Sequence, residues 1–405
     1  MRVLQVHNLY QLPGGEDRVV EDERALLESR GHRVFTHVVH NDAVQGHGKL
    51  ALAARSVWSR TSAAALRALC REHRPDVAHF HNTLPLVSPS GYYAVRREGA
   101  AVVQTLHNYR LLCPVATCYR DGSICEDCVG KPVKWPAVKH GCYRGSRAAS
   151  AAVAGVLAVH GALGTYRREV DAYIACSDFM REKMIEGGIA AERIVTKPNF
   201  VPDDPGAGDG SGGYALYLGR LVEDKGLGVL IEAWERLAAS GGEVPALRVV
   251  GKGPMADAVR SLADRVPAVT YRDWVGQPEL GELLGRAGFL VLPTLNYEGF
   301  PKVIVEAYAH GVPVVTSSMG SAGSVVAEGE TGRRVAMGDA AELAAVCWEL
   351  AGDAAQRARL RAGARQAYET HYTADVNHDQ LIAVYRGAVA QRDAVPAVVP
   401  RHDPA

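Results

Sequence analysis

The sequence predicts an α/β fold made of two doubly wound, Rossmann-like domains that face a central cleft. Short apolar runs alternate with helical patterns, which is typical of parallel sheets covered on both faces. A glycine-rich stretch interrupts this alternation near mid-chain, and the alternation restarts after it. The length of 405 residues suits two or three domains. Ligands of such sheets bind at the carboxyl ends of the strands, so the cleft is the expected site.

Residues 1–200 predict the first domain. Helical patterns cover Val19–Ser29, which Gly31 is placed to end, and Asp178–Glu186. The apolar runs are short and nearly continuous, as expected of strands buried on both faces. The expected strands are Val3–His7, Arg33–Val39, Val77–Phe80, Val102–Leu106, Tyr173–Cys176 and Ile194–Lys197.

The second half of the chain repeats this pattern. Residues 201–213 are polar and glycine-rich and offer nothing to a core, so they predict a linker. Residues 214–372 predict the second domain, 373–393 a last helix, and the proline-containing residues 394–405 a disordered tail. The expected strands are Tyr214–Leu218, Leu247–Val250, Phe289–Leu292 and Val312–Thr316, and the expected helices are Gly228–Leu237 and Val303–His310.

The composition of the chain argues against several classes of protein. Lys+Arg and Asp+Glu are 45 each, which argues against a general nucleic-acid binder. No apolar run approaches the ~20 residues of a membrane helix, so membrane association is expected only peripherally. The nearest run, Ala148–Gly164, is interpreted as a buried or interfacial helix. The start of the chain has no signal-peptide pattern and eight cysteines do not make a disulfide scaffold, so we expect a cytoplasmic protein. The sequence does not indicate an oligomeric state.

Arg220 and Lys225 lie on an expected strand-to-helix loop in the second domain. Two cations beside a helix N-terminus suit a diphosphate, because guanidinium, ammonium and backbone N–H groups can face one anion. The alternative is a solvated loop charge pair in which Lys225 neighbours Asp224. No Asp-x-Asp motif stands at a strand end to bridge a divalent ion to a diphosphate, so we expect a clamp that needs no metal.

Glu298 and Glu306 flank the start of a helix downstream. Carboxylates accept hydrogen bonds from hydroxyl groups and therefore suit a sugar and a ribose. Gly299 would let backbone approach a ligand closely. Two alternatives stay open at this point: the acid pair of a glycosidase, which belongs on opposite walls of a cleft, and two surface glutamates.

Taken together, these residues resemble the glycosyltransferases of GT-B fold in the large retaining family four (glycosyl transferases group 1), over nearly the whole chain. The resemblance rests on Gly219-Arg220 with Lys225-Gly226, on Glu298 and Glu306 followed by Ala307-x-x-x-Gly311-x-Pro313-Val314-Val315, on the loop Pro13-Gly14-Gly15-Glu16, and on Thr105-Leu106-His107-Asn108. One departure is Lys302, where many relatives have a small or apolar residue; it either contacts phosphate or sugar, or is solvated.

The resemblance implies roles for the matching positions. Arg220 and Lys225 would hold the donor diphosphate and Glu306 the ribose. Glu298 would hold hydroxyls of the donor sugar, with Gly299, Phe300 and Pro301 beside it. His107 would lie near the reaction centre, and Gly14 and Gly15 would lie beneath the reacting groups. A last helix would cross back onto the first domain.

The implied reaction moves a sugar from a UDP-, GDP- or dTDP-linked donor to an acceptor hydroxyl with retention of anomeric configuration. The donor would bind mainly on the second domain and the acceptor, a small molecule, glycolipid or natural product, on the first. Three alternatives remain: a nucleotide-sugar epimerase, a sugar phosphorylase, and an inactive protein that binds sugar nucleotides.

Five of the eight cysteines fall within residues 113–142. Cys125 and Cys128 have the two-residue gap of a zinc knuckle, and Cys113 and Cys142 are plausible partners, which leaves Cys118 spare. His140 could replace one ligand. A structural zinc would fix an insertion that has little apolar periodicity, and unligated thiols or a disulfide are the alternatives. Similar cysteine-rich stretches occur in a subset of the resembling transferases.

His79 and His81 end an expected strand, as His7 does. They either line the cleft, or one is buried in the core and the other solvated.

Overall fold

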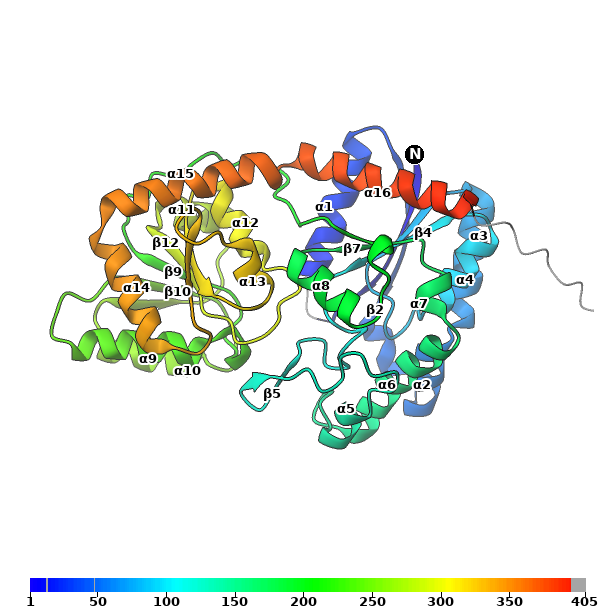
Figure 1. Ribbon diagram of the computed structural model, residues 1–405, viewed down its shortest axis with the longest axis horizontal. Coiled ribbons are helices and arrows are strands. Elements are labelled where there is room, and N and C mark those ends of the chain that lie inside the picture. Colours follow the sequence, from blue (N-terminus) through cyan, green and yellow to red (C-terminus); the bar gives the residue numbers. More distant parts are fainter. Residues whose placement is uncertain (12–13, 47, 395–405) are drawn as a thin grey trace, which may run out of the picture.

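The computed structural model describes residues 1–11, 14–46 and 48–394. Two α/β domains lie side by side, and each is a parallel six-stranded sheet with helices on both faces (Figure 1). This confirms the predicted fold class. The predicted disordered tail falls on residues 395–405, apart from Ala394, and so lies outside the described residues.

The N-terminal sheet has the spatial strand order β2-β1-β3-β4-β7-β8, with every pair parallel. Its strands are β1 (Arg2–Leu9), β2 (Arg33–His40), β3 (Val77–Phe80), β4 (Ala101–Leu106), β7 (Ala172–Ala175) and β8 (Ile194–Thr196). The helices are α1 (Gly15–Ser29), α2 (Lys49–Val57), α3 (Arg60–His73), α4 (Ser90–Arg97), α5 (Trp135–His140), α6 (Arg147–Ala162), α7 (Thr165–Arg168) and α8 (Asp178–Glu186), with the 3₁₀ turns η1 (Asn41–Gly46) and η2 (Ala191–Arg193).

The C-terminal sheet has the order β11-β10-β9-β12-β13-β14, also entirely parallel. Its strands are β9 (Ala215–Leu218), β10 (Leu247–Val250), β11 (Val269–Arg272), β12 (Phe289–Leu292), β13 (Val314–Ser317) and β14 (Gly332–Val335). The helices are α9 (Leu227–Ala239), α10 (Ala256–Arg265), α11 (Gln277–Arg286), α12 (Lys302–Ala309), α13 (Gly320–Val325), α14 (Ala340–Gly352) and α15 (Ala354–His371), with the 3₁₀ turn η3 (Glu223–Lys225).

Residues 113–142 lie between β4 and α6 and contain little regular structure. A two-stranded antiparallel ribbon of β5 (Tyr119–Arg120) and β6 (Ser123–Ile124) is followed by the short helix α5. The insertion extends beneath the junction of the two domains (Figure 1).

The last helix, α16 (Ala374–Ala394), leaves the C-terminal domain and lies along the N-terminal one (Figure 1). Leu381, Tyr385 and Ala388 are buried in one apolar cluster with Val3 and Val77 of the N-terminal sheet. The N-terminal core therefore includes the end of the chain. In the described residues, no helix is long and apolar enough to cross a bilayer.

Candidate functional site

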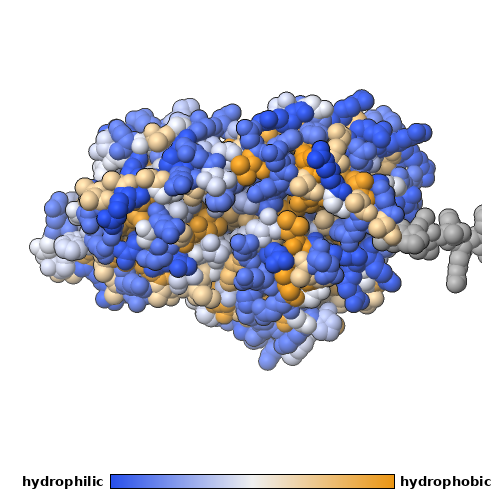
Figure 2. Space-filling view, turned by 45° about the horizontal axis from the view of Figure 1, so that its top comes forward, coloured by the Kyte–Doolittle hydropathy of each residue, from blue (hydrophilic) through white to orange (hydrophobic). Residues whose placement is uncertain are grey.

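A cavity of about 370 Å³ opens between the two domains. In the view of Figure 2, hydrophilic residues cover most of the molecule, and apolar residues gather on the N-terminal domain and along the domain junction. The N-terminal domain lines the cavity with Gly15, Glu16, His107, Cys176 and Asn199; the C-terminal domain lines it with Tyr217, Leu218, Gly219, Arg220, Lys225, Trp274, Leu292, Glu298, Gly299, Phe300, Pro301, Lys302, Val303 and Glu306.

The strand order explains why these side chains meet. In the C-terminal sheet the order of strands reverses between β9 and β12, and loops that leave such neighbouring strands in opposite directions open a crevice. Arg220 follows β9, and Glu298 follows β12. In the N-terminal sheet, His107 follows β4 directly. The structure thus brings Arg220, Lys225, Glu298, Glu306 and His107 together, although they are far apart in the sequence.

The loop that carries Lys225 is tied to the loop after β12. A Cβ on Gly226, whose φ is 75°, would lie 1.8 Å from the carbonyl oxygen of Pro293, so this close approach requires glycine. The Asn296 amide donates to the Asp224 carboxylate over 2.6 Å. Because Asp224 is engaged there, Lys225 pairs with Glu298 instead, with Nζ and Oε2 2.6 Å apart. The interpretation of Lys225 and Asp224 as a solvated loop pair is therefore wrong.

Arg220 and Glu298 both keep unused hydrogen-bonding capacity. Within the described part of the chain, no carboxylate lies within 4.0 Å of the exposed Arg220 guanidinium. Glu298 is mostly buried, and its second oxygen, Oε1, has no hydrogen-bond partner there. A free guanidinium and an unpaired carboxylate oxygen, both at the cavity, suit an anion and a hydroxyl group respectively.

The loop that carries Glu298 is seated in the N-terminal domain. The buried Tyr297 ring packs 4.7 Å from Phe179, measured between centroids. The Tyr297 backbone N–H donates to the carbonyl of Thr117, in the cysteine-rich insertion, and Tyr109 Oη donates to the carbonyl of Glu298. The N-terminal domain therefore determines the position of Glu298.

The backbones of the two domains approach each other closely at Gly299. A Cβ built on it would lie 1.7 Å from the carbonyl oxygen of His107 and 3.4 Å from the backbone nitrogen of Asn108. Backbone cannot yield as a flexible side chain can, so any larger residue must move one domain away from the other.

We therefore expect Gly299→Ala to lower kcat/KM for the reaction at this cavity by about 10²-fold, because misplacement of reacting groups by ~1 Å has effects of this size. Gly281→Ala is the matched control, since a Cβ there would have 3.8 Å of clearance. Steady-state kinetics and the unfolding midpoint of both variants provide the measurement. Wild-type kinetics for Gly299→Ala would contradict the close approach.

Glu306 lines the cavity near three other charged residues, Lys302, Asp22 and Arg18. Burial raises the pKa of its carboxyl group, nearby Asp22 raises it further, and Lys302 opposes both. Lys302 Nζ lies 2.5 Å from Asp22 Oδ2, so an ion pair joins α12 to α1 across the cleft, and Arg18 also pairs with Asp22. The interpretation of Lys302 as a solvated side chain is therefore wrong.

The glycine pair lies at the start of α1 on the opposite wall, with Gly14 as the N-cap and Gly15 as the first residue of the helix. Gly15 lines the cavity, whereas Gly14 caps the helix and is not among the lining residues. Glu16 belongs to the resembling loop but was not predicted as a site residue; it lines the cavity, accepts a hydrogen bond from Tyr10, and burial raises its pKa to about 8. Its position in the sequence, directly after the glycine pair, was the feature from which a role at the site could have been predicted.

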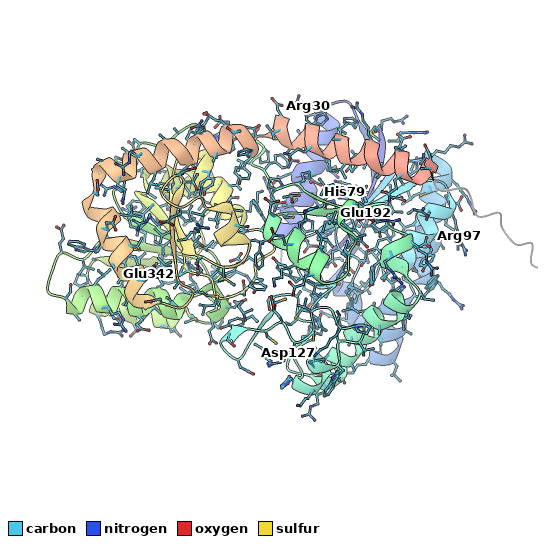
Figure 3. The ribbon with its side chains drawn as sticks, in the orientation of Figure 1. Arg30, His79, Arg97, Asp127, Glu192 and Glu342 are labelled. Atoms are coloured by element: carbon cyan, nitrogen blue, oxygen red, sulfur yellow. The ribbon has the colours of Figure 1, made fainter. Side chains whose placement is uncertain are left out.

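A buried histidine cluster lies behind His107. His107 Nε2 is 3.0 Å from His81 Nδ1, and burial together with neighbouring histidines lowers both pKa values far below the usual range, so both rings are neutral. His79 contacts Tyr385 Oη and Thr105 Oγ1, each at 2.8 Å, and lies beneath α16 (Figure 3). Both His79 and His81 are buried, so the expectation that one is solvated is wrong.

Glu23, His79 and His81 place one potential metal ligand each within 4.8 Å of one another. However, Lys197 Nζ lies 2.8 Å from Glu23 Oε1, and both side chains are almost completely buried. The lysine already balances the carboxylate, and a divalent ion beside two neutral histidines would add uncompensated buried charge. We interpret the group as a buried ion pair within a polar network.

The thiols of the cysteine-rich insertion lie too far apart to form a compact cluster. Cys118, considered spare, lies beside Cys113 and lowers the pKa of that thiol to about 6, and all eight cysteines are free thiols, so the disulfide alternative is not seen. Among the described residues, no three of these sulfur atoms lie within 4.8 Å of one another. The donor set Cys113, Cys125, Cys128 and Cys142 suits zinc chemically, but its sulfur atoms are not arranged as a tetrahedron.

Two family models match the chain. The model described as "Glycosyltransferase Family 4" matches residues 13–204, and that described as "Glycosyl transferases group 1" matches residues 212–353. Together these ranges take in most of both domains.

Curated relatives carry related descriptions. Glycogen synthase of Mycobacterium tuberculosis (strain CDC 1551 / Oshkosh) is 29% identical over 349 residues, covering 81% of this chain and 73% of the relative. D-inositol 3-phosphate glycosyltransferase of Stackebrandtia nassauensis is 34% identical over 200 residues, covering 47% and 44% of the two chains.

Solved structures share the fold. Anabaena Alr3699/HepE in complex with UDP superposes with a TM-score of 0.67 at 17% identity, covering 95% of this chain and all of the other. Sucrose-phosphate synthase from Thermosynechococcus elongatus gives a TM-score of 0.70 at 17% identity, covering 96% and 99%.

Proposed function

The chain belongs to the glycosyltransferases of group 1 and family 4, and we propose that it transfers a sugar from a nucleoside-diphosphate sugar to an acceptor hydroxyl. The proposal includes retention of anomeric configuration and a reaction that needs no catalytic divalent metal. The observation that carries it is the convergence of Arg220, Lys225, Glu298, Glu306 and His107 on one cavity between two domains.

Each residue has a proposed contact with the donor. Arg220 and Lys225 bind the diphosphate, and Glu306 accepts hydrogen bonds from the ribose hydroxyls. The unpaired Oε1 of Glu298 accepts a hydrogen bond from a hydroxyl of the sugar, with Gly299, Phe300 and Pro301 beside it. His107 faces the sugar, and Gly14 and Gly15 leave room beneath the reacting groups.

In the proposed reaction, the bond between the anomeric carbon and the diphosphate oxygen breaks, and its electron pair stays on the diphosphate. Arg220 and Lys225 stabilise this growing negative charge. The acceptor oxygen bonds to the anomeric carbon from the side of the leaving group, and its proton passes to a phosphate oxygen. Because His107 is neutral and mostly enclosed, it orients the sugar by hydrogen bonding rather than as an acid.

Two observations support the choice of charge stabilisation over a glycosidase mechanism. Glu298 and Glu306 come from one loop and helix, so they do not flank a glycosidic bond from opposite walls as a glycosidase pair does. Lys225 also occupies one oxygen of Glu298.

A donor screen tests the proposal. UDP-glucose is the first choice, since a solved neighbour is described as a complex with it, followed by GDP- and dTDP-linked sugars. Mass spectrometry should detect donor consumption that depends on both protein and acceptor, equal with and without a chelator, and NMR of the product should show the donor's anomeric configuration.

Other outcomes of the same screen would identify the alternatives. Turnover of donor alone without transfer would indicate an epimerase, and a requirement for free phosphate would indicate a phosphorylase. Donor binding without any turnover would indicate an inactive sugar-nucleotide-binding protein.

The ion pair between Lys302 and Asp22 is expected to favour the closed arrangement of the domains. Lys302→Met should raise the donor KM by about 5- to 10-fold, because a largely buried cross-domain pair stabilises closure by an amount that corresponds to such a factor. Asp22→Asn should give the same change, and the double variant should be no worse than either single one. Additive effects of the two substitutions would show that the residues act separately.

We also propose that Cys113, Cys125, Cys128 and Cys142 hold a structural zinc ion, with His140 as a possible substitute ligand. The chemistry of the donor set and the sparse regular structure of the insertion support it. Elemental analysis of the purified protein should find about one zinc per chain, lost in Cys125→Ser/Cys128→Ser but kept in Cys70→Ser. Equal metal content in all three proteins would exclude the site.

A further inference from the structure

Two segments of the N-terminal domain carry an unbalanced positive charge. Residues 43–71 and 128–168 contain twelve Lys+Arg and no Asp or Glu, although the whole chain has 45 of each sign. The acidic residues that flank these segments each have a basic or histidine neighbour: Asp42 lies beside His40, Glu72 beside His73, Asp127 beside Arg120 and Glu169 beside Arg96. Arg60, Arg67 and Arg71 lie on α3, where Arg71 pairs with Glu98, and Lys134 is buried, so about eight of the twelve cations make up the basic region around α2, α5 and α6.

The same segments expose apolar side chains. Of the eleven large hydrophobic residues that are exposed in the described chain, six belong to them: Leu50, Trp58, Val133, Trp135, Val159 and Leu163. Leu50 is 88% exposed and Trp135 is 56% exposed. Between Arg147 and Leu163 the outward side of α6 carries only small and apolar residues, among them Ala148, Ala151 and Ala162.

These elements form one face. Helix α6 packs against both α2 and α5, and the three helices lie together at the lower end of the N-terminal domain (Figure 1). Lys139 Nζ lies 5.9 Å from the centre of the Trp135 ring, so cation and exposed aromatic ring are neighbours. Lys49 and Leu50 are adjacent and exposed on α2. We name this face, formed by α2, α5 and α6, the basic apolar face.

Cations interleaved with exposed tryptophan and aliphatic side chains match one kind of partner. Lysine and arginine are attracted to anionic lipid headgroups, and tryptophan and leucine insert at the boundary between headgroups and acyl chains. A nucleic acid would use the cations but offers nothing to Leu50, Val133, Val159 or Leu163. A second copy of the chain would bring its own cations to the same face and repel it.

We infer that the basic apolar face docks the protein on an anionic lipid bilayer. The face lies on the domain proposed to bind the acceptor. A small cavity of about 40 Å³ is lined by His107 and by Leu157 of α6 and Tyr166, so the inner side of α6 and His107 face the same cavity. Docking in this way holds the domain that is proposed to bind the acceptor against the membrane surface.

Vesicle sedimentation with the full chain tests this inference. We expect binding to vesicles of phosphatidylcholine with about one-third phosphatidylglycerol to be at least tenfold tighter than to phosphatidylcholine alone, and to weaken as salt is raised. Leu50→Ser/Trp135→Ser should lower binding to anionic vesicles about tenfold, and Lys131→Glu/Lys139→Glu should lower it further.

The C-terminal domain supplies matched controls. Trp348 is exposed to the same degree as Trp135, at 58%, and Trp348→Ser should leave vesicle binding unchanged. Arg286→Glu/Arg359→Glu matches the charge reversal on another surface. All of these side chains are exposed, so unfolding midpoints should stay at the wild-type value and confirm that the variants fold.

Three results would overturn the inference. One is equal binding to anionic and neutral vesicles; another is an equal loss of binding in Trp135→Ser and Trp348→Ser. The third is evidence that something other than a bilayer binds the basic apolar face. This would be either a concentration-dependent dimer that Trp135→Ser abolishes, or duplex DNA bound as tightly as anionic vesicles. None of these readouts depends on sugar transfer, so failure here is distinguishable from failure of the proposed function.

Discussion

Replacing Arg220 with alanine is expected to lower kcat for sugar transfer by about 10²- to 10³-fold, because one preorganised charge at a developing anion contributes roughly 2.7–4 kcal/mol to the transition state. Arg220 is exposed at the cavity and pairs with no carboxylate in the described chain, so its replacement leaves no carboxylate without an ion-pair partner. The folded structure should therefore persist while turnover falls.

Separate measurement of kcat and KM tests whether Arg220 stabilises the transition state or only binds the donor. A cation that only bound donor would change KM and leave kcat intact, whereas one that stabilises the leaving diphosphate must lower kcat with saturating donor. Arg220→Lys should recover part of the loss, because it restores the charge without the two-pronged geometry. Arg359→Ala, at an exposed position on α15, is the control. Unchanged kcat in Arg220→Ala would refute the diphosphate clamp.

Lys225→Ala is expected to cause a similar loss of activity with an added structural effect. Its ammonium is the ion-pair partner of the mostly buried Glu298. Removing the cation leaves that buried carboxylate without its ion-pair partner. The kinetics of Lys225→Ala alone would therefore combine the loss of diphosphate binding with the effect of the unpaired carboxylate. Comparison of Glu298→Gln with Lys225→Ala/Glu298→Gln separates them, since the glutamine carries no charge that needs a partner and its effect on sugar binding is the same in both variants.

The second large effect concerns stability. Lys197→Met is expected to lower the free energy of unfolding by about 3–5 kcal/mol, the usual cost of removing one partner from a buried ion pair. The Glu23 and Lys197 side chains are 1% and 2% exposed, with Oε1 and Nζ 2.8 Å apart. Lys197 also contacts Asn377 of α16, at 3.2 Å, so the substitution affects the attachment of the last helix as well.

A double-mutant cycle measures this pair. Glu23→Leu should be about as damaging as Lys197→Met, whereas Glu23→Leu/Lys197→Met should recover much of the loss, because no unpaired charge remains buried. Denaturant unfolding of the four proteins provides the free energies. If the two single substitutions were harmless, or simply additive in the double variant, the pair would not be coupled.

The sequence predicted those parts of the fold that have a local signature. The apolar runs of β3, β9 and β12 are buried along their whole length and were found at or within one residue of their bounds. Strand β11 was missed because Thr270, Tyr271 and Arg272 follow Val269 at the sheet edge, where one side faces solvent and no apolar run is needed.

The same reasoning explains what could be predicted of the candidate site. Arg220, Lys225, Glu298 and Glu306 lie within two short segments, each with a recognisable spacing, and the structure brings them to one cavity. The ion pair of Lys302 with Asp22 joins residues 280 apart in the sequence, and that of Lys197 with Glu23 joins residues 174 apart. No local pattern links such residues, because each contact exists only after the chain has folded.

The path of α16 constrains how the chain can be made. On a ribosome, residues 1–200 emerge long before Leu381 and Tyr385, which complete their apolar cluster, and before Asn377, which contacts Lys197. Until then, the surface that α16 will cover stays exposed to solvent, and the ion pair of Lys197 with Glu23 lacks its contact with Asn377. The first domain to be synthesised is therefore among the last to finish folding, and a stop codon shortly before α16 would leave a nascent product dependent on chaperones.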